Sequence, residues 1–365
     1  MPHILDEELY QALMAIAACP TAPCHEVHIR NCLLARLADL PHVSTRLDEF
    51  GNLHAVYEHD AAGREPFRVV AHMDHPGFVI KGEEVHFAGG VEEKYFAGRG
   101  IVFHNEKITR PLGRAVIAST SFSDDLKLVI IDRAIPPEAT FATWDLPKAR
   151  CTERLFISPA CDDLAQVAVV LALMRKLSLS GAKGCVHALF TRAEEIGFAG
   201  ALAALKSKTS LAPMPTLSLE ASKARGFARV DGGPVVRVGD RLSIFDSRIT
   251  HWLETAFRDL QATKPGAIYQ RLLMSGGTCE ASVFHRAGLP TGALCVALNN
   301  YHNMGPGTSL RAESISLRDC QGLHDLLFFL ATEAKTVLAT DEAVAERFAR
   351  LEVKALGVLH DDLLD

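Results

Sequence analysis

The chain has 365 residues, which is longer than one ordinary domain, so a main body with an inserted or appended module is expected. Its hydrophobic content of 48% is enough for a buried core. A formal charge of -6 with dispersed lysines and arginines excludes a basic footprint for nucleic acid or an anionic membrane. Small or peptidic partners fit this composition better.

The cysteines and the N-terminus bear on the location of the protein. Nine scattered cysteines without a CxxC pair argue against a disulfide framework or a zinc ribbon. Acidic residues precede the first apolar stretch and no basic segment does, so this stretch is interpreted as an amphipathic helix and not as a secretory signal. The longest candidate apolar run, residues 167–173, is far below the roughly 18 residues of a membrane span. A cytoplasmic protein with reduced thiols is predicted.

The chain has three successive regions with different sequence patterns. Two helical segments, about 4–19 and 25–39, precede strand-like runs at 43–47, 53–57 and 67–71. From about residue 80 to 152, short strands such as GIVFHN, RAVIAS and LKLVIID predict a small β module. From Asp162 onward, strands in GCVHALFTRAEE, PTLSLEA and PTGALCVAL alternate with helices, which predicts an α/β sheet flanked by helices.

The predicted organisation is therefore discontinuous. We expect an α/β domain over residues 1–78 and 153–336, with an inserted barrel-like β domain over residues 79–152. Within the second part, helices are expected near 197–206, 246–262 and 279–287. Residues 337–365 are expected to add a surface helix.

Side chains that can bind metals gather where predicted strands end, the edge at which open α/β sheets bind ligands. They are His72 and Asp74 in AHMDHPG, Asp162 and Asp163 in ACDDLA, Glu194 and Glu195 in TRAEEIG, Glu220 in SLEAS and His302 in NNYHNMG. Each has a structural explanation of its own; Asp162 or Asp163 can cap the following helix, and Glu220 can pair with Lys223. Together they favour a metal site, because a cluster of carboxylates repels itself unless cations neutralise it.

These residues lie in a series of motifs that resembles the dizinc aminopeptidases which assemble into hollow tetrahedral particles, the glutamyl aminopeptidases. The resemblance runs over about residues 5–335 and rests on PTAPCHE, AHMDHPGF, GGVEEKYFAGRGIVFH, ACDDLAQVAVV, FTRAEEIGFAGA, SGGTCEAS and AGLPTGALCVALNNYHN. It implies a zinc-peptidase-like fold, with a mixed sheet and the inserted β domain. It also implies removal of N-terminal residues from peptides and a homo-oligomer, either a dimer or a dodecamer.

The resemblance also implies a metal ligand set, motif by motif. His72 and Glu220 would bind one cation, Glu195 and His302 the other, and the carboxylate of Asp162 would bridge both. Mixed nitrogen and oxygen ligands suit Zn²⁺, with Co²⁺ or Mn²⁺ as further candidates.

Two further roles complete the predicted chemistry. Glu194 is the expected general base toward a water shared by the two cations. Glu194 and Glu195 are neighbours at a predicted strand end, so their side chains should point in opposite directions and divide the two tasks. Asp74 returns to the side of His72 and is expected to orient its imidazole.

Several positions depart from the family pattern. Glu220 stands where the family usually has Asp, and Cys279 followed by Glu280 stands where GGT is usually followed by Asp. The stretch NNYHNMGPG lacks the Arg and the downstream Glu expected around the final His. These differences concern substrate preference more than metal binding. The Asp162–Asp163 peptide is implied to be cis.

Other functions fit the sequence less well than an aminopeptidase. Carboxypeptidase-like and deacylase-like enzymes share the metal cage, but their second domain usually follows the glutamate motif, whereas this insertion follows the first metal motif. Adjacent Glu194 and Glu195 would not flank a glycosidic bond as the acids of a glycosidase do. An inactive binding protein, or a Cys279 nucleophile with His285, is less favoured because every metal and base role has a competent residue. The preference for the N-terminal residue stays open.

Overall fold

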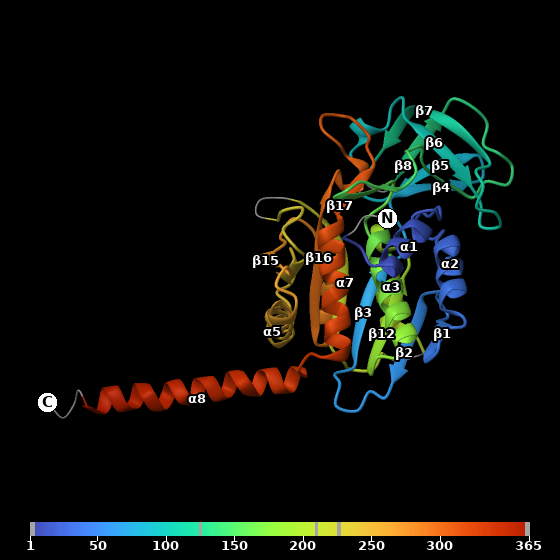
Figure 1. Ribbon diagram of the computed structural model, residues 1–365. Helices are drawn as coiled ribbons and strands as arrows, with labels where there is room; N and C mark the ends of the chain where they lie inside the picture. The colour runs from blue at the N-terminus through green and yellow to red at the C-terminus, as the bar shows by residue number, and fades with distance from the viewer. Residues whose placement is uncertain (1–3, 124–125, 209–210, 225–227, 362–365) are drawn as a thin grey trace.

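The computed structural model describes residues 4–123, 126–208, 211–224 and 228–361. It contains an 11-stranded mixed sheet flanked by helices and a closed six-stranded barrel at one end of the molecule (Figure 1). The strands along the large sheet are, in spatial order, β1 (Val43–Leu47), β2 (Leu53–His59), β12 (Gly184–Thr191), β3 (Phe67–His72), β13 (Thr216–Lys223), β16 (Thr291–Asn299), β17 (Glu313–Ser316), β11 (Leu155–Ser158) and β10 (Arg150–Cys151). Two more strands branch from this path, β14 (Val235–Gly239) beside β16 and β15 (Gln270–Leu273) beside β14.

The centre of the sheet is parallel. Strands β12, β3, β13 and β16 pair in one direction, so their carboxyl ends meet at one edge. All six residues of β3 are buried, which explains why its sequence reads as a continuous apolar run instead of an alternating one. The register puts His72 beside Thr191, three residues before Glu194 and its neighbour Glu195. The predicted metal-binding residues are thereby brought to the same edge of the sheet.

Helices cover both faces of the sheet. They are α1 (Glu7–Ile16), α2 (Val27–Leu37), α3 (Leu164–Ser180), α4 (Ala199–Lys206), α5 (Ser247–Thr263), α6 (Glu280–Arg286) and α7 (Leu317–Thr332). Helix α3 is apolar on almost every side and packs between α1, α7 and the sheet. It ends at Gly181 in the left-handed conformation that favours glycine. Burial of α3 fixes the position of the two aspartates at its start.

The inserted β module is a closed barrel. Its strands are, in order around the barrel, β4 (Gly77–Lys81), β5 (Glu84–Ala88), β8 (Lys127–Ile131), β7 (Gly113–Phe122), β6 (Gly100–His104) and β9 (Phe141–Trp144). Its core holds edge-to-face aromatic rings from Phe78, Phe87, Phe96 and Trp144. The predicted fold class, a mixed α/β sheet with a barrel-like insertion, is confirmed.

The predicted domain limits differ slightly from the sheet boundaries. Strand β4 begins two residues before the predicted limit of 79, and β10, predicted within the inserted module, pairs with β11 in the large sheet. The turn between β3 and β4 is short, so the strand pattern resumes before the composition changes. The division of the chain into domains is retained as a proposal.

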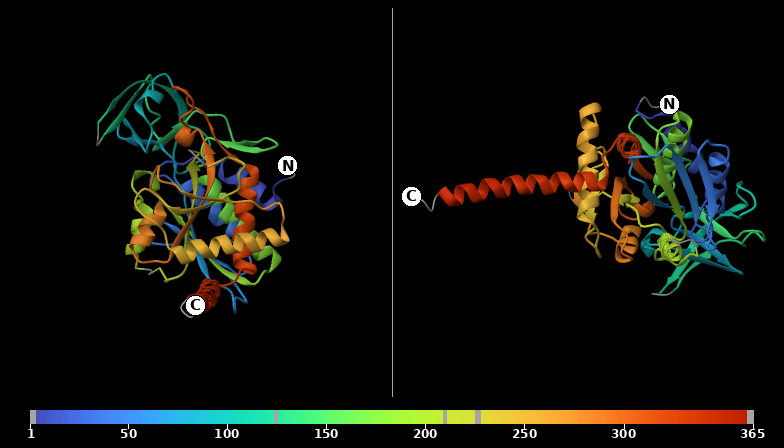
Figure 2. Two further views of the ribbon diagram at one scale, coloured as in Figure 1. Left: turned by 90° about the vertical axis from the view of Figure 1, so that its left-hand side faces the viewer. Right: turned by 90° about the horizontal axis from the view of Figure 1, so that it is seen from below.

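The last helix, α8 (Val337–Asp361), leaves the body of the molecule. Its first turns contact α5, and the rest stands away from the body in Figure 1 and in the right-hand view of Figure 2. The sequence predicted a surface helix over this segment, and the structure has a helix there with Phe348, Leu351 and Leu356 exposed. None of the described helices is long and apolar enough to cross a membrane.

Candidate metal centre

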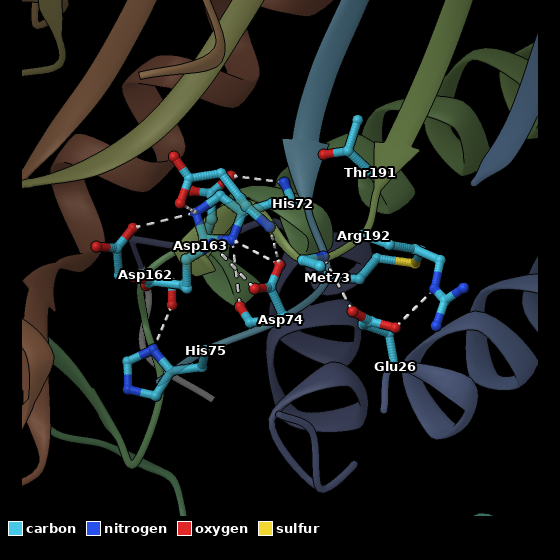
Figure 3. Close-up of polar contacts among 12 residues, drawn as sticks. Glu26, His72, Met73, Asp74, His75, Asp162, Asp163, Thr191 and Arg192 are labelled. Atoms are coloured by element: carbon cyan, nitrogen blue, oxygen red, sulfur yellow. Dashed lines mark hydrogen bonds and ion pairs between the residues drawn. The ribbon is translucent and has the colours of Figure 1, made fainter. Parts of the chain in front are cut away.

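His72 ends β3 with its ring facing the edge of the sheet. Its Nδ1 lies 3.2 Å from the backbone oxygen of Asp74, and this contact directs Nε2 toward two carboxylates (Figure 3). The Nε2 atom lies 3.7 Å from Oδ1 of Asp162 and 3.9 Å from Oε2 of Glu194. An imidazole held through Nδ1 with Nε2 free is the usual arrangement of a metal-binding histidine.

Asp162 stands between two histidines. Its Oδ1 faces His72 and its Oδ2 lies 3.5 Å from Nε2 of His302. The Asp162–Asp163 peptide is cis, as the resemblance implies. Asp163 faces the other way, and its Oδ2 accepts the backbone N–H of His72 at 3.3 Å. The two oxygens of Asp162 are therefore divided between two groups of possible ligands.

The two adjacent glutamates lie in a turn. The expectation that they end a strand is wrong, because η2 (Glu194–Ile196) is a 3-10 turn that follows Ala193 in the left-handed region, at φ 50°. Their side chains still separate. Oε1 of Glu195 lies 3.1 Å from Nε2 of His302, and Glu194 faces His72. The turn, not strand alternation, accounts for the divergence.

Asp74 supports this turn as well as His72. Its carboxylate accepts the backbone N–H groups of Glu194 at 2.9 Å and Glu195 at 3.1 Å, whereas its Oδ1 lies 3.5 Å from Nδ1 of His72. The predicted orienting contact is thus the longest of the three. The contacts of Asp74 with the backbone of Glu194 and Glu195 could not be predicted from the spacing of AHMDHPG, because they depend on the register of β3 with β12.

Replacing Asp74 by Asn should lower activity by about 10- to 100-fold with the fold retained, because Asn offers one acceptor to two N–H donors. Steady-state kinetics with a thermal unfolding curve would measure this. Asp60→Asn, on an exposed loop, serves as the control. Full activity of Asp74→Asn with an unchanged metal content would contradict the expectation.

His302 is held by groups from both parts of the molecule. It lies in η3 (Tyr301–Asn303) after β16, and its Nδ1 is 2.9 Å from the backbone oxygen of Gly90. Gly90 belongs to the segment after β5, so the inserted barrel contributes directly to the site. The backbone N–H of His302 donates to Glu313 at 2.7 Å. The expected lack of a downstream Glu is therefore corrected: Glu313 follows eleven residues later and is fully buried.

Glu313 joins the two loops that carry Asp162 and His302. Its second oxygen accepts the N–H groups of Cys161 at 2.6 Å and Asp162 at 3.0 Å. Glu313 was not predicted from the motif around His302, because residues 304–312 separate the two along the chain. His75 was not predicted either. Its ring contacts the backbone oxygen of Asp162 (Figure 3) and, through the other ring nitrogen, the side chain of Asn303.

Glu313→Gln should weaken metal retention by about 10- to 100-fold. The substitution replaces one carboxylate oxygen by an NH2 group, which cannot accept a hydrogen bond from the loop that it faces. Metal content after dialysis against graded chelator concentrations would measure the effect. Glu333→Gln, on the exposed end of α7, is a matched control. Equal metal retention in both variants would show that Glu313 does not position the ligands.

Three groups of three side chains at this edge could each hold one cation, with ligand atoms within 4.8 Å of one another. Two of them share Asp162: His72, Asp162 and Glu220 in one, and Asp162, Glu195 and His302 in the other. The third consists of His72, Glu194 and Glu195. Four buried atoms of this set have no hydrogen-bond partner, namely Asp162 Oδ1, Glu195 Oε1, Glu220 Oε1 and His302 Nε2. Buried polar atoms are normally paired, so their convergence indicates a missing cationic partner. The residues fit a pair of cations that share Asp162.

A fourth group, away from this edge, fits a cation poorly. Asp6, His324 and Asp325 also lie close together. Asp6 pairs with Lys176 at 2.7 Å, and Asp325 pairs with Lys264. Lysines already neutralise these carboxylates, so a metal ion is not needed there.

Electrostatics of the site also require positive charge. Burial raises the pKa of Glu194 well above its usual range, and the nearby Glu220, Glu195 and Glu280 add to the rise. Burial raises the pKa of Glu220 to about 8, with Asp162 contributing, and that of Glu280 to about 7. These carboxylates cannot all ionise at neutral pH without cations between them.

A cavity of about 610 Å³ opens onto this centre. His72, Asp162, Glu194, Glu195 and Glu220 line its floor, and segments 272–278 and 221–223 line its wall. Met304 and Glu92 also line the cavity. Its volume suits one or two amino-acid residues of a substrate.

Comparison with known proteins agrees with this geometry. The family model of the M42 glutamyl aminopeptidases matches residues 137–318, which include Asp162, Glu194, Glu195, Glu220 and His302. The chain belongs to the M42 glutamyl aminopeptidase family. The predicted family is confirmed, and the match begins in the inserted barrel and extends into α7.

Solved structures share the M42 fold at low sequence identity. The TET1 peptidase of Pyrococcus horikoshii, described as assembling into a tetrahedron or an octahedral shell, is 22% identical with a TM-score of 0.70, covering 89% of this chain and 99% of its own. A TET aminopeptidase from the marine sediment archaeon Thaumarchaeota archaeon SCGC AB-539-E09 is 18% identical with a TM-score of 0.73, covering 93% and 99%. A Thermotoga maritima protein named as an endoglucanase is 17% identical with a TM-score of 0.66, covering 90% and 99%. At these identities the structures support the fold.

Proposed function

We propose that the protein is a dizinc aminopeptidase in which Asp162 bridges the cations, His72 and Glu220 complete one site and Glu195 and His302 complete the other. Membership of the M42 family supports a metal-dependent hydrolase acting at peptide N-termini. The observation that carries the ligand assignment is Asp162, whose two oxygens face His72 and His302 separately. The nitrogen and oxygen donors suit Zn²⁺, and also Co²⁺ or Mn²⁺.

Two bound cations would supply Lewis acidity and lower the pKa of a water molecule between them. Glu194 lies beside this position, outside the two groups that share Asp162 and within the third group, with His72 and Glu195. Its carboxylate takes the proton from the attacking water and delivers it to the leaving amine. Asp74 holds the backbone of Glu194 in place during both transfers. The turn η2 holds Glu194 in place. Gly90, in the segment after β5, holds the ring of His302 through its Nδ1 atom.

A substrate panel tests the reaction class. The protein is loaded with Zn²⁺, Co²⁺ or Mn²⁺ and assayed with aminoacyl-anilides, dipeptides, N-acyl amino acids and N-blocked peptides. Cleavage of free N-terminal residues and none of N-blocked substrates is expected. Activity on N-acyl compounds alone would instead assign the site to a deacylase, and release of C-terminal residues would assign it to a carboxypeptidase.

The thiol alternative loses support from burial. Cys279 is 1% exposed, and burial raises the pKa of its thiol well above the usual range. Its backbone N–H donates to Asp240 at 3.0 Å. Cys279 is also the residue that immediately precedes α6. A protonated thiol in this setting is a packing group.

We also propose that the protein forms a homo-oligomer in the cytoplasm. TET relatives of the same fold are described as dodecamers or shells, which supports assembly of this chain. Its cysteines are free, with buried thiols at five positions, which fits a reducing compartment. Light scattering on the purified protein measures the assembly; a monomer at micromolar concentration would exclude it.

A further inference from the structure

Glu92 is an acidic residue of the cavity that the metal centre does not use. It lies between β5 and η1 (Glu93–Tyr95), in the inserted barrel. The other carboxylates among the described residues that line the cavity are all assigned above to the centre, namely Asp162, Glu194, Glu195 and Glu220. The remaining charged residues of the lining are basic, Lys223 and Arg237 on β14. Within the described lining, negative charge outside the centre therefore comes from Glu92.

The charge of a peptide N-terminus calls for such a group. An α-ammonium has a pKa of about 7.7 to 8.0, so it is charged at neutral pH. In the proposed function, two divalent cations balance the carboxylates of Asp162, Glu194, Glu195 and Glu220, which leaves no net negative charge there for the ammonium. Desolvating an ammonium without an opposite charge is costly. Because the α-nitrogen is only two bonds from the carbonyl carbon that is attacked, its partner has to border the centre.

Contacts on both sides hold the backbone of Glu92 beside the centre. Two residues before it, the backbone oxygen of Gly90 lies 2.9 Å from Nδ1 of His302. Three residues after it, the hydroxyl of Tyr95 donates to the backbone oxygen of Gly305 at 3.2 Å. The segment that carries Glu92 is thus attached twice to the loop that carries a proposed metal ligand. A carboxylate on a fixed backbone can select a small charged group.

The two glutamates of GGVEE have different partners. Oε1 of Glu93 accepts the hydroxyl of Thr120 on β7 at 2.6 Å, away from the cavity lining. Oε2 of Glu92 pairs with the ammonium of Lys94 at 2.7 Å, and both of these side chains are at least half exposed. An exposed ion pair of this kind contributes little to stability, so a second ammonium can replace Lys94. Glu92 therefore already binds the chemical group that a peptide N-terminus presents.

We propose that Glu92 binds the free α-ammonium of the substrate at the mouth of the cavity. This inference rests on the proposed function and deepens it, because it explains how the site distinguishes an N-terminus from an internal amide. The substrate ammonium takes the place of Lys94 on the carboxylate, and a charge-assisted hydrogen bond of this type is stronger than a neutral one. An acylated N-terminus carries no charge and leaves the pair of Glu92 and Lys94 intact.

Paired inhibitors isolate the ammonium contact. Leucine hydroxamate and isocaproyl hydroxamate differ only in the α-amino group, and both are measured on the metal-loaded full chain by competitive inhibition and by calorimetry. Wild type is expected to bind the amine-bearing member more tightly. Glu92→Gln should reduce this preference by about 10-fold, because a charge-assisted bond becomes a neutral one. Metal content and affinity for the isocaproyl compound should stay at the wild-type level.

Neighbouring substitutions serve as controls. Glu93→Gln, whose side chain contacts Thr120, should keep the wild-type preference. Lys94→Gln removes the competing ammonium and should raise the preference. An unchanged preference in Glu92→Gln, or an equal loss of affinity for both inhibitors, would overturn the proposal, since the second result would mean that Glu92 only supports the loop of His302.

Wild-type behaviour separates this proposal from the proposed function. If the enzyme releases free N-terminal residues but binds both hydroxamates equally, the assignment of Glu92 fails and the aminopeptidase stands. If it cleaves N-acyl compounds alone, the aminopeptidase proposal fails first, and the assignment of Glu92 falls with it.

Discussion

Glu194→Gln is expected to reduce kcat by about 10³-fold while both cations stay bound. The amide cannot take a proton, and the side chain lies outside both groups that share Asp162. Its neighbours constrain it to the same place, because the backbone N–H of Glu194 still donates to Asp74. The loss should therefore appear in turnover rather than in metal content or stability.

Three measurements check this result together: steady-state kinetics on the substrates cleaved by wild type, metal content and thermal unfolding. Glu195→Gln, which changes a proposed ligand, should lose metal as well as activity. Glu83→Gln, on the exposed turn between β4 and β5, should match wild type in all three. If Glu194→Gln retained full turnover, or if it lost metal as Glu195→Gln does, its assignment as the base would be wrong.

The candidate site was largely predictable from the sequence because each proposed ligand lies close to the end of a strand whose sequence pattern is clear. His72 ends a wholly buried strand, and Glu194 and Glu195 follow another that pairs with it in parallel. Parallel strands bring such ends to one edge, so short motifs separated by many residues still converge. The proposed ligand His302 follows β16 in the same way.

The supporting residues were not predictable by the same reasoning. Glu313 lies at the start of β17, and its function depends on the distance to two loops rather than on its neighbours in the chain. Arg237 is one basic residue in a strand, and only the pairing of β14 with β16 places it beside the cavity. Such residues depend on contacts across strands that no local pattern encodes.

Removal of the metal ions should destabilise the protein increasingly as the pH rises. In the folded protein without cations, the pKa of Glu220 is raised to about 8 and that of Glu280 to about 7, against an ordinary value of 4.5. A carboxyl with a raised folded pKa contributes stability that is complete below about pH 4.5 and is lost as the pH passes through the folded pKa. His72 and His302, whose pKa values neighbouring carboxylates raise against the effect of burial, act in the same direction.

Bound cations would take the place of these protons. The stability of the metal-loaded protein should therefore not fall in this way as the pH rises. Between pH 6 and pH 9 we expect the metal-free protein to lose on the order of 3 kcal/mol of unfolding free energy, a fall in Tm of several degrees. Thermal unfolding with and without chelator over this range measures the difference. Metal affinity should rise over the same range, because cations and protons compete for the same oxygens and nitrogens.

Glu220→Gln provides the decisive comparison. In the metal-free state it should flatten the pH dependence, because the group with the pKa of about 8 is gone, and in the presence of metal it should weaken one site. Glu92→Gln, at the exposed mouth of the same cavity, should leave the dependence intact. Equal slopes with and without metal would mean that no cations hold these carboxylates apart, and the shared site at Asp162 would have to be abandoned.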